Sequence, residues 1–275
     1  MKDLKEVISN YSSTDLEQRK HWYSPAAEAY NKVRPRYPKE LIDRVVNVAQ
    51  LSADSKILEV GCGPATATVA FAPLNCSIVG LEPNPDFCRL AQQNCEPYPN
   101  VEIQNTSFEE WMLEAEQFDA VLSATAFHWI PPEVGYPKAA ATLREDGYLI
   151  LLWNKELQPQ YEVYQRLSEV YQVYAPSLSR YEERETQEEI LRGLGQMVID
   201  SGQFKDLVSD QVMSEVTYTV NDYLALLNTY SPYLALDPQS REALFEGLKE
   251  TIEQNYEGRI QLSYLSAFHI ARKDK

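Results

Sequence analysis

Short apolar runs alternate with helical stretches through the middle of the chain. Helix patterns lie near residues 65–72, 85–95, 108–115 and 136–143. The strand-like runs are KILEV, CSIVGLE, NVEIQN, FDAVLSA and GYLILLWN. Strands that alternate with helices form a parallel sheet covered by helices on both faces. Residues 56–154 therefore predict the core of an α/β fold.

The two ends of the chain follow other patterns. Residues 14–30 favour a polar helix, and the proline-containing turn VRPRYP leads from it into a second helix, ELIDRVVNVAQL. Residues 156–204 show no strand pattern, and a stripe of tyrosines between Tyr161 and Tyr174 lies on one helix face. Two more strands, DLVSDQVMSEVTYTV and RIQLSYLSAFHIAR, are predicted with two helices between them.

Together these patterns predict one domain over residues 1–275. Its sheet has seven strands, is mostly parallel and carries helices on both faces. Residues 1–38 form an N-terminal helical cap, residues 39–155 and 205–275 form the core, and residues 156–204 form a helical insertion after the fifth strand.

A glycine turn directly follows the first strand, in ILEVGCGPAT. Gly61 and Gly63 place no side chain in the turn, and Pro64 suits the first turn of a helix. Ligands of such folds bind at this edge of the sheet, and Glu82, at the end of the second strand, is spaced to accept two ribose hydroxyls. These residues predict a pocket for a cofactor that contains adenosine.

Two positions argue against a nicotinamide dinucleotide as that cofactor. Thr66 stands where the dinucleotide fingerprint has its last glycine. In a dinucleotide site the Glu59 carboxylate would face the negatively charged pyrophosphate. A carboxylate two residues before the turn suits a cationic ligand instead. S-adenosylmethionine carries a sulfonium and an ammonium group and no phosphate, so it fits better. A nicotinamide-dependent oxidoreductase remains an alternative.

The stretch from residue 57 to residue 154 resembles the class I S-adenosylmethionine-dependent methyltransferases, which have a Rossmann-like fold. The segments that carry the resemblance are ILEVGCGPAT, VGLEPNPDF, QNTSFEEW, FDAVLSATAFHWI and LREDGYLILLWN. Ala65 departs from the family by replacing its usual third glycine. Upstream, AEAYNKVRPRYP is similar to the cap of a small-molecule subgroup that includes the trans-aconitate methyltransferases.

The glycine turn, the sheet edge and the resemblance give candidate residues for the site. Ser107 and Phe108 would flank the adenine, and Tyr30 and Arg34 would close over the methionine end, with Arg34 pairing with its carboxylate. The cofactor-binding candidates are Tyr30, Arg34, Glu59, Gly61, Gly63, Glu82, Pro83, Ser107, Phe108 and Ala124. The substrate-binding candidates are Tyr37, Trp129, Asn154 and Tyr230.

His128, which follows the fourth strand, is the candidate catalytic residue. A histidine at this edge could take a proton from the methyl acceptor, or it could hydrogen-bond a loop. A carboxylate acceptor would need no base, because it is already ionised. The insertion at 156–204 follows the fifth strand, so it would overhang the site and shape the substrate pocket.

Composition limits the kinds of molecule that this chain is expected to bind. A net charge of −16 disfavours nucleic acid, and no apolar run is long enough to cross a membrane. The four cysteines form no metal-binding pattern and suit free thiols in the cytoplasm. We expect a cytoplasmic methyltransferase that acts on a small molecule and releases S-adenosylhomocysteine. A binding protein without turnover is an alternative; the acceptor and the oligomeric state stay open.

Overall fold

The computed structural model describes residues 15–274 of the 275-residue chain. Residues 1–14 of the predicted cap therefore lie outside the described residues. The division into cap, core and insertion stays a prediction.

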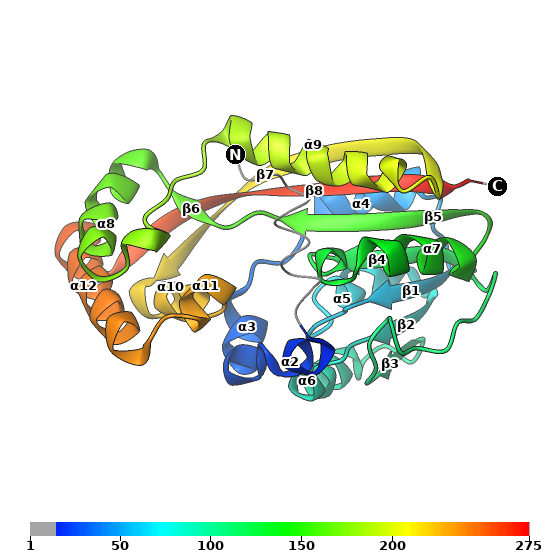
Figure 1. Cartoon of the computed structure of the whole chain (residues 1–275), viewed down its shortest axis with the longest axis horizontal. Helices are drawn as coiled ribbons and strands as arrows, with labels where there is room; N and C mark the ends of the chain where they lie inside the picture. Colours follow the sequence, from blue (N-terminus) through cyan, green and yellow to red (C-terminus); the bar gives the residue numbers. More distant parts are fainter. Residues whose placement is uncertain (1–14, 275) are drawn as a thin grey trace.

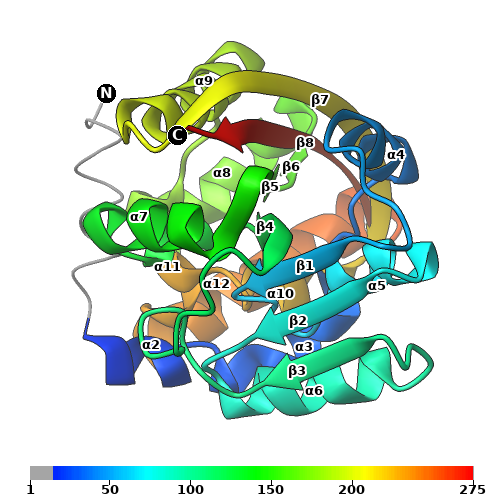
Figure 2. The same cartoon turned by 90° about the vertical axis from the view of Figure 1, so that its right-hand side faces the viewer.

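One mixed sheet forms the centre of the molecule (Figures 1 and 2). Its parallel part runs in the order β3-β2-β1-β4-β5, and β8 continues it in the antiparallel direction. The bounds are β1 (Lys56–Val60), β2 (Ser77–Leu81), β3 (Val101–Gln104), β4 (Phe118–Ala124), β5 (Leu143–Asn154), β6 (Gln158–Pro159), β7 (Phe204–Thr219) and β8 (Arg259–Lys273).

The sheet has eight strands in the described part of the chain, so the prediction of seven was wrong. The additional strand is β6, which pairs with Ser263 and Leu262 of β8. β8 is long enough to pair with β5 over residues 266–272 and with β6 beyond the end of β5. Two residues carry no alternating pattern, so only the tertiary pairing identifies this strand.

Helices cover both faces of the sheet, as predicted. α4 (Lys39–Val48), α5 (Thr68–Phe71) and α6 (Pro85–Cys95) lie on one face, and α7 (Pro132–Thr142) and α9 (Arg184–Asp200) lie on the other (Figure 2). Leu191 and Val198 of α9 are buried against the sheet. This half of the 156–204 stretch therefore covers the sheet.

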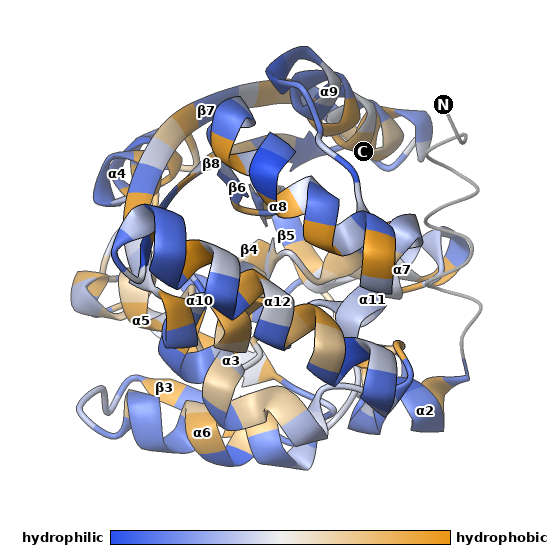
Figure 3. Ribbon diagram, turned by 90° about the vertical axis from the view of Figure 1, so that its left-hand side faces the viewer, coloured by the Kyte–Doolittle hydropathy of each residue, from blue (hydrophilic) through white to orange (hydrophobic). Residues whose placement is uncertain are grey.

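A further group of helices forms what we call the helical lobe, around the far ends of β7 and β8 (Figure 1). It consists of α8 (Tyr161–Tyr174), the short η4 (Pro176–Leu178), α10 (Val220–Leu227), α11 (Ser231–Leu234) and α12 (Pro238–Tyr256). Hydrophobic and hydrophilic bands alternate along α8 and α12 (Figure 3), as expected of helices with one buried face. Three helices, rather than the predicted two, separate the last two strands.

Three predicted helices differ from the structure. The described part of the helix predicted at 14–30 is divided into α2 (Leu16–His21), η1 (Ser24–Ala26) and the start of α3 (Ala27–Val33), with Pro25 at the break. The helix near 65–72 is shortened to α5 and followed by η2 (Ala72–Leu74), because Ala65 has a left-handed backbone (φ +66°). Residues 108–115 form no helix: residues 108–110 form a turn, which Ser107 caps by accepting a hydrogen bond from Glu110 N–H.

Candidate active site

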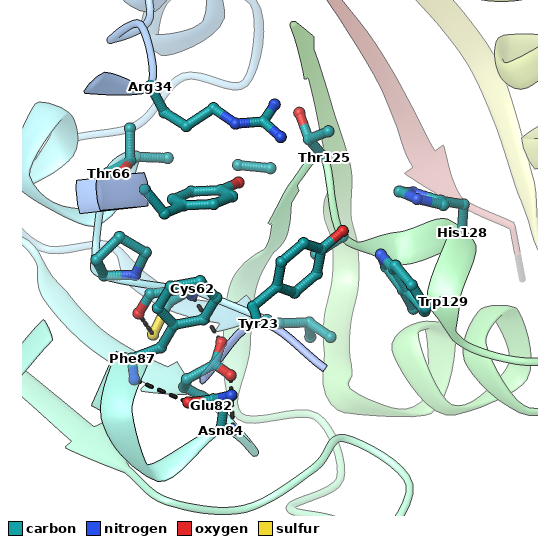
Figure 4. A pocket seen from close by; sticks show the side chains of 18 of the residues that line it. Tyr23, Arg34, Cys62, Thr66, Glu82, Asn84, Phe87, Thr125, His128 and Trp129 are labelled. Carbon is teal, nitrogen blue, oxygen red and sulfur yellow. Dashed lines mark hydrogen bonds between the residues drawn. The ribbon is translucent and has the colours of Figure 1, made fainter. Parts of the chain in front are cut away.

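A cavity of about 280 Å³ lies at the carboxyl ends of β1, β2, β4 and β5 (Figure 4). The N-terminal segment, the short η3 (Phe127–Trp129) and residues 230–232 also line it. All but one of the predicted site residues line this cavity. They are Tyr30, Arg34, Tyr37, Gly61, Gly63, Glu82, Pro83, Ser107, Phe108, Ala124, His128, Trp129, Asn154 and Tyr230.

The glycine turn needs glycine at its first position for two reasons. Gly61 has a positive φ of +66°, and a Cβ there would lie 2.7 Å from Cβ of Ala126. Gly63 also has a positive φ (+57°), but no atom lies within 4 Å of the place of its Cβ. The turn thus packs closely on the loop after β4 at Gly61 and leaves space at Gly63.

Glu82 is the buried carboxylate of the cavity and is 5% exposed. Its Oε2 accepts a hydrogen bond from Gly63 N–H at 2.8 Å, and its Oε1 accepts one from Asn84 N–H at 2.7 Å (Figure 4). Burial raises the pKa of Glu82 to about 7, and the two backbone donors oppose this rise. A carboxylate oxygen can accept more than one hydrogen bond, so Glu82 can also receive ligand hydroxyls.

Glu59 is the predicted residue that does not line the cavity. It is fully buried in β1, where its Oε2 accepts a hydrogen bond from Thr68 Oγ1 at 2.6 Å. Burial raises the pKa of Glu59 to about 8. In the sequence, Glu59 stands two residues before the turn. In the structure, β1 directs its side chain toward α5 and away from the cavity.

Phe108 and Ser107 line the cavity and are themselves almost fully buried. The Phe108 ring stacks on Trp111 with centroids 6.3 Å apart, and Nζ of Lys138 lies 5.3 Å from the Phe108 ring. Phe108 thus belongs to the core and presents only part of its ring to a ligand.

Arg34 joins the N-terminal segment to the loop at the end of α10. Its Nε donates to Thr229 Oγ1 and its Nη2 donates to the Thr229 carbonyl oxygen, both at 2.8 Å. Its guanidinium carbon lies 4.0 Å from the ring centre of Tyr230 and 4.8 Å from that of Tyr30. Within residues 15–274 no carboxylate forms an ion pair with Arg34. A guanidinium held in this way can receive an anion.

Two of the predicted substrate residues, Tyr37 and Asn154, meet in a hydrogen-bonded network at the ends of β4 and β5. Tyr37 Oη and Thr125 Oγ1 are 2.8 Å apart, and Asn154 N–H donates to Thr125 Oγ1. Asn154 Nδ2 donates to the Pro35 carbonyl oxygen. Asn154 therefore connects the N-terminal segment to β5.

His128 lies in η3 between two tryptophans, with its ring centroid 5.7 Å from that of Trp129 and 5.6 Å from that of Trp153. Burial lowers its pKa to about 4. At neutral pH its imidazole is uncharged and only weakly basic, so it is a better hydrogen-bonding group than proton acceptor.

Sequence reasoning missed Tyr23, Asn84 and Thr125. Tyr23 stacks on Phe87, and its hydroxyl lies 2.8 Å from Oγ of Ser231, which also lines the cavity. No local pattern marks Tyr23. Asn84 could have been found from the sequence, because an asparagine directly before Pro85 is typical of a helix N-cap. In the structure its Oδ1 accepts hydrogen bonds from Asp86 N–H and Phe87 N–H at the start of α6.

Residues 57–147 match a family profile described as a methyltransferase domain. An uncharacterised methyltransferase of Mycobacterium bovis is 30% identical over 132 residues, which are 48% of this chain and 51% of that protein. The chain thus spans about half the length of the first curated relatives that it matches.

Two solved structures share the fold. A candidate type II methyltransferase of Anaeromyxobacter dehalogenans matches with a TM-score of 0.66 at 20% identity, over 87% of this chain and 97% of that one. A phosphoethanolamine N-methyltransferase of Haemonchus contortus, in complex with S-adenosyl-L-methionine, matches with a TM-score of 0.52 at 11% identity, over 96% of this chain and 60% of that one. The protein has a Rossmann-like methyltransferase fold.

Proposed function

Since residues 57–147 match a methyltransferase domain in a chain with the Rossmann-like methyltransferase fold, we propose that the protein transfers a methyl group from S-adenosylmethionine to a small molecule. The observation that carries the proposal is the buried Glu82 carboxylate beside the open glycine turn at Gly63. The domain match and the fold support S-adenosylmethionine as the cofactor.

The residues that line the cavity fit that cofactor. Glu82 would accept the ribose hydroxyls, and Asn84 and Phe87 lie beside it. Ser107, Phe108 and Pro83 would border the adenine, while Ala124 and the glycine turn would leave room for the centre of the cofactor. Tyr30 and Arg34 would hold the methionine end, where Arg34 can pair with the carboxylate. When bound, the cofactor supplies an electrophilic methyl group on a sulfonium.

The surroundings of His128 favour an acceptor that is already ionised. Burial lowers the pKa of His128 to about 4, and Tyr37 is hydrogen-bonded to Thr125. Neither is a strong base at neutral pH, so a carboxylate is the acceptor class that fits best. His128, Trp129, Asn154 and Tyr230 would then orient it. Alignment of this kind can supply up to roughly 7–11 kcal/mol of a barrier.

The first test is calorimetric titration of the purified protein with S-adenosylmethionine, S-adenosylhomocysteine and a nicotinamide dinucleotide. We expect micromolar binding of the first two and none of the dinucleotide. A second assay follows the release of S-adenosylhomocysteine with a panel of small carboxylates, phenols and amines. Binding without release over the whole panel would favour a binding protein without turnover; binding of the dinucleotide alone would refute the proposal.

A further inference from the structure

A second, smaller cavity of about 60 Å³ adjoins the cofactor cavity inside the helical lobe. We call it the tyrosine chamber, because five tyrosines line it. They are Tyr164, Tyr171, Tyr223, Tyr230 and Tyr233. Leu157, Tyr230, Pro232 and Glu156 line both cavities, so the two meet along these residues. The chamber therefore borders the cavity where we place the methyl group, with these residues as their shared boundary.

The inner wall of the chamber is apolar. Leu167, Tyr171, Tyr223 and Leu227 are each 5% exposed or less. The outer rim is polar, because Arg180 pairs with Glu156 at 3.2 Å and both side chains are about half exposed (55% and 44%). A ligand group inside the chamber would lie against ring faces and leucine side chains and would have charged groups only at the rim.

The polar atoms of the chamber already have partners within the protein. The Tyr171 and Tyr233 hydroxyls lie 2.7 Å apart, and Tyr230 Oη accepts from Leu157 N–H. Gln158 exchanges two hydrogen bonds with the backbone of Glu182. Among residues 15–274, the buried side-chain polar atoms that lack a partner all lie outside this chamber. The inner lining thus offers a ligand mainly apolar surface, and the charged side chains lie at the rim.

The size of the chamber limits what can enter it. A water-sized sphere needs about 10–15 Å³ by this measure, so about 60 Å³ holds roughly four to six atoms of that size. The chamber therefore takes nothing larger than a single six-membered ring. Aromatic pairs also contribute about 0.5–1.5 kcal/mol beyond the area that they bury, which favours an aromatic ring over an aliphatic group between tyrosines.

We propose that the tyrosine chamber binds the aromatic ring of the methyl acceptor, and that the acceptor is a small arene carboxylate. This rests on the proposed function, because the acceptor's carboxylate must reach the methyl group in the neighbouring cavity. The ring lies among Tyr164, Tyr171 and Tyr233, and the carboxylate extends past Tyr230. One carboxylate oxygen forms a bond to the methyl carbon as the carbon–sulfur bond breaks, and the sulfur keeps the bonding electrons.

The test measures binding directly and so does not depend on turnover. The protein saturated with S-adenosylhomocysteine is titrated with benzoate, phenylacetate, isovalerate, succinate and benzylamine. Leu178→Trp adds bulk at a residue that lines the chamber, and Val173→Trp is its matched control, because Val173 is 69% exposed on α8 and does not line it. Tyr164→Leu keeps an apolar wall but removes one ring.

We expect an arene carboxylate to bind best of the five probes. Leu178→Trp should weaken its binding at least tenfold, Tyr164→Leu by about three- to tenfold, and Val173→Trp by less than twofold. Unchanged S-adenosylhomocysteine affinity in every variant would show that the fold is intact. If Leu178→Trp changes the S-adenosylhomocysteine affinity, the binding of the arene carboxylate to Tyr164→Leu becomes the deciding measurement.

Three results would overturn the proposal: equal affinity for isovalerate, tighter binding of benzylamine, or arene binding that neither chamber variant changes. Failure of S-adenosylhomocysteine itself to bind the unaltered protein would instead refute the proposed function, so the two failures can be told apart.

Discussion

Glu82 at the end of β2 holds the backbone of Gly63 in the turn after β1, through the 2.8 Å hydrogen bond from Gly63 N–H to Glu82 Oε2. The carboxylate that faces the cofactor thus also fixes the loop that the cofactor approaches. Strand β2 lies next to β1 in register, with Leu81 opposite Val60, which brings the two residues together. Ribose recognition and turn geometry are therefore coupled.

Glu82→Ala should weaken S-adenosylhomocysteine binding by about 1–3 kcal/mol, because it leaves buried polar groups without a partner. Glu82→Gln should cost less, since its amide oxygen can still accept one backbone hydrogen bond. Calorimetry measures both, with Glu102→Gln, an exposed change on β3, as the control. Unchanged affinity in Glu82→Ala would remove Glu82 from the site.

Gly61→Ala and Gly63→Ala separate close packing from backbone strain. Both place a side chain at a positive φ, which costs roughly 1–2 kcal/mol. Only Gly61→Ala also forces a Cβ to 2.7 Å from Ala126, and such overpacking costs about 1–3 kcal/mol more. Urea unfolding without cofactor should find Gly61→Ala the less stable variant. Equal stabilities would contradict the packing argument.

Glu59 should make the protein less stable as pH rises. Burial raises its pKa to about 8 in the folded protein, from an ordinary value near 4.5. The folded state then binds more protons than the unfolded state between these values, so the free energy of unfolding falls as pH increases through that window. Glu82, with a pKa of about 7, acts in the same direction.

Glu59→Gln mimics the protonated acid at every pH. It should match the unaltered protein near pH 4.5 and be the more stable of the two above pH 8, by roughly 3–5 kcal/mol. Urea unfolding at a series of pH values measures this, and Glu102→Gln again serves as the exposed control. A difference that is the same at all pH values would show that folding does not raise the pKa of Glu59.

Arg34→Met should weaken cofactor binding by about 1.5–3 kcal/mol, the usual contribution of hydrogen bonds to a charged group. Arg34→Lys should recover only part of this, because lysine lacks the fork that spans the Thr229 hydroxyl and carbonyl. Arg36→Met is the matched control, since Arg36 lies two residues away and does not line the cavity. Equal losses at the two positions would show that Arg34 makes no direct contact with the cofactor.

Local sequence determined the strands and the glycine turn. Alternating apolar runs and the positions of Gly61, Gly63 and Glu82 fix the parallel strands and the ends at which ligands bind, because the carboxyl ends of parallel strands share one edge. α6 has the bounds 85–95 that its pattern predicted, since Asn84 caps it and Pro85 begins it.

Tertiary structure decided what the sequence pattern could not show. Glu59 and Glu82 are both acids near the turn, but only the twist and pairing of the strands direct Glu82 into the cavity and Glu59 into the core. Tyr23 meets Ser231, and Tyr164 meets the residues around Tyr233, across long separations in sequence. Contacts of this kind depend on how the chain folds back on itself, and local periodicity carries no information about them.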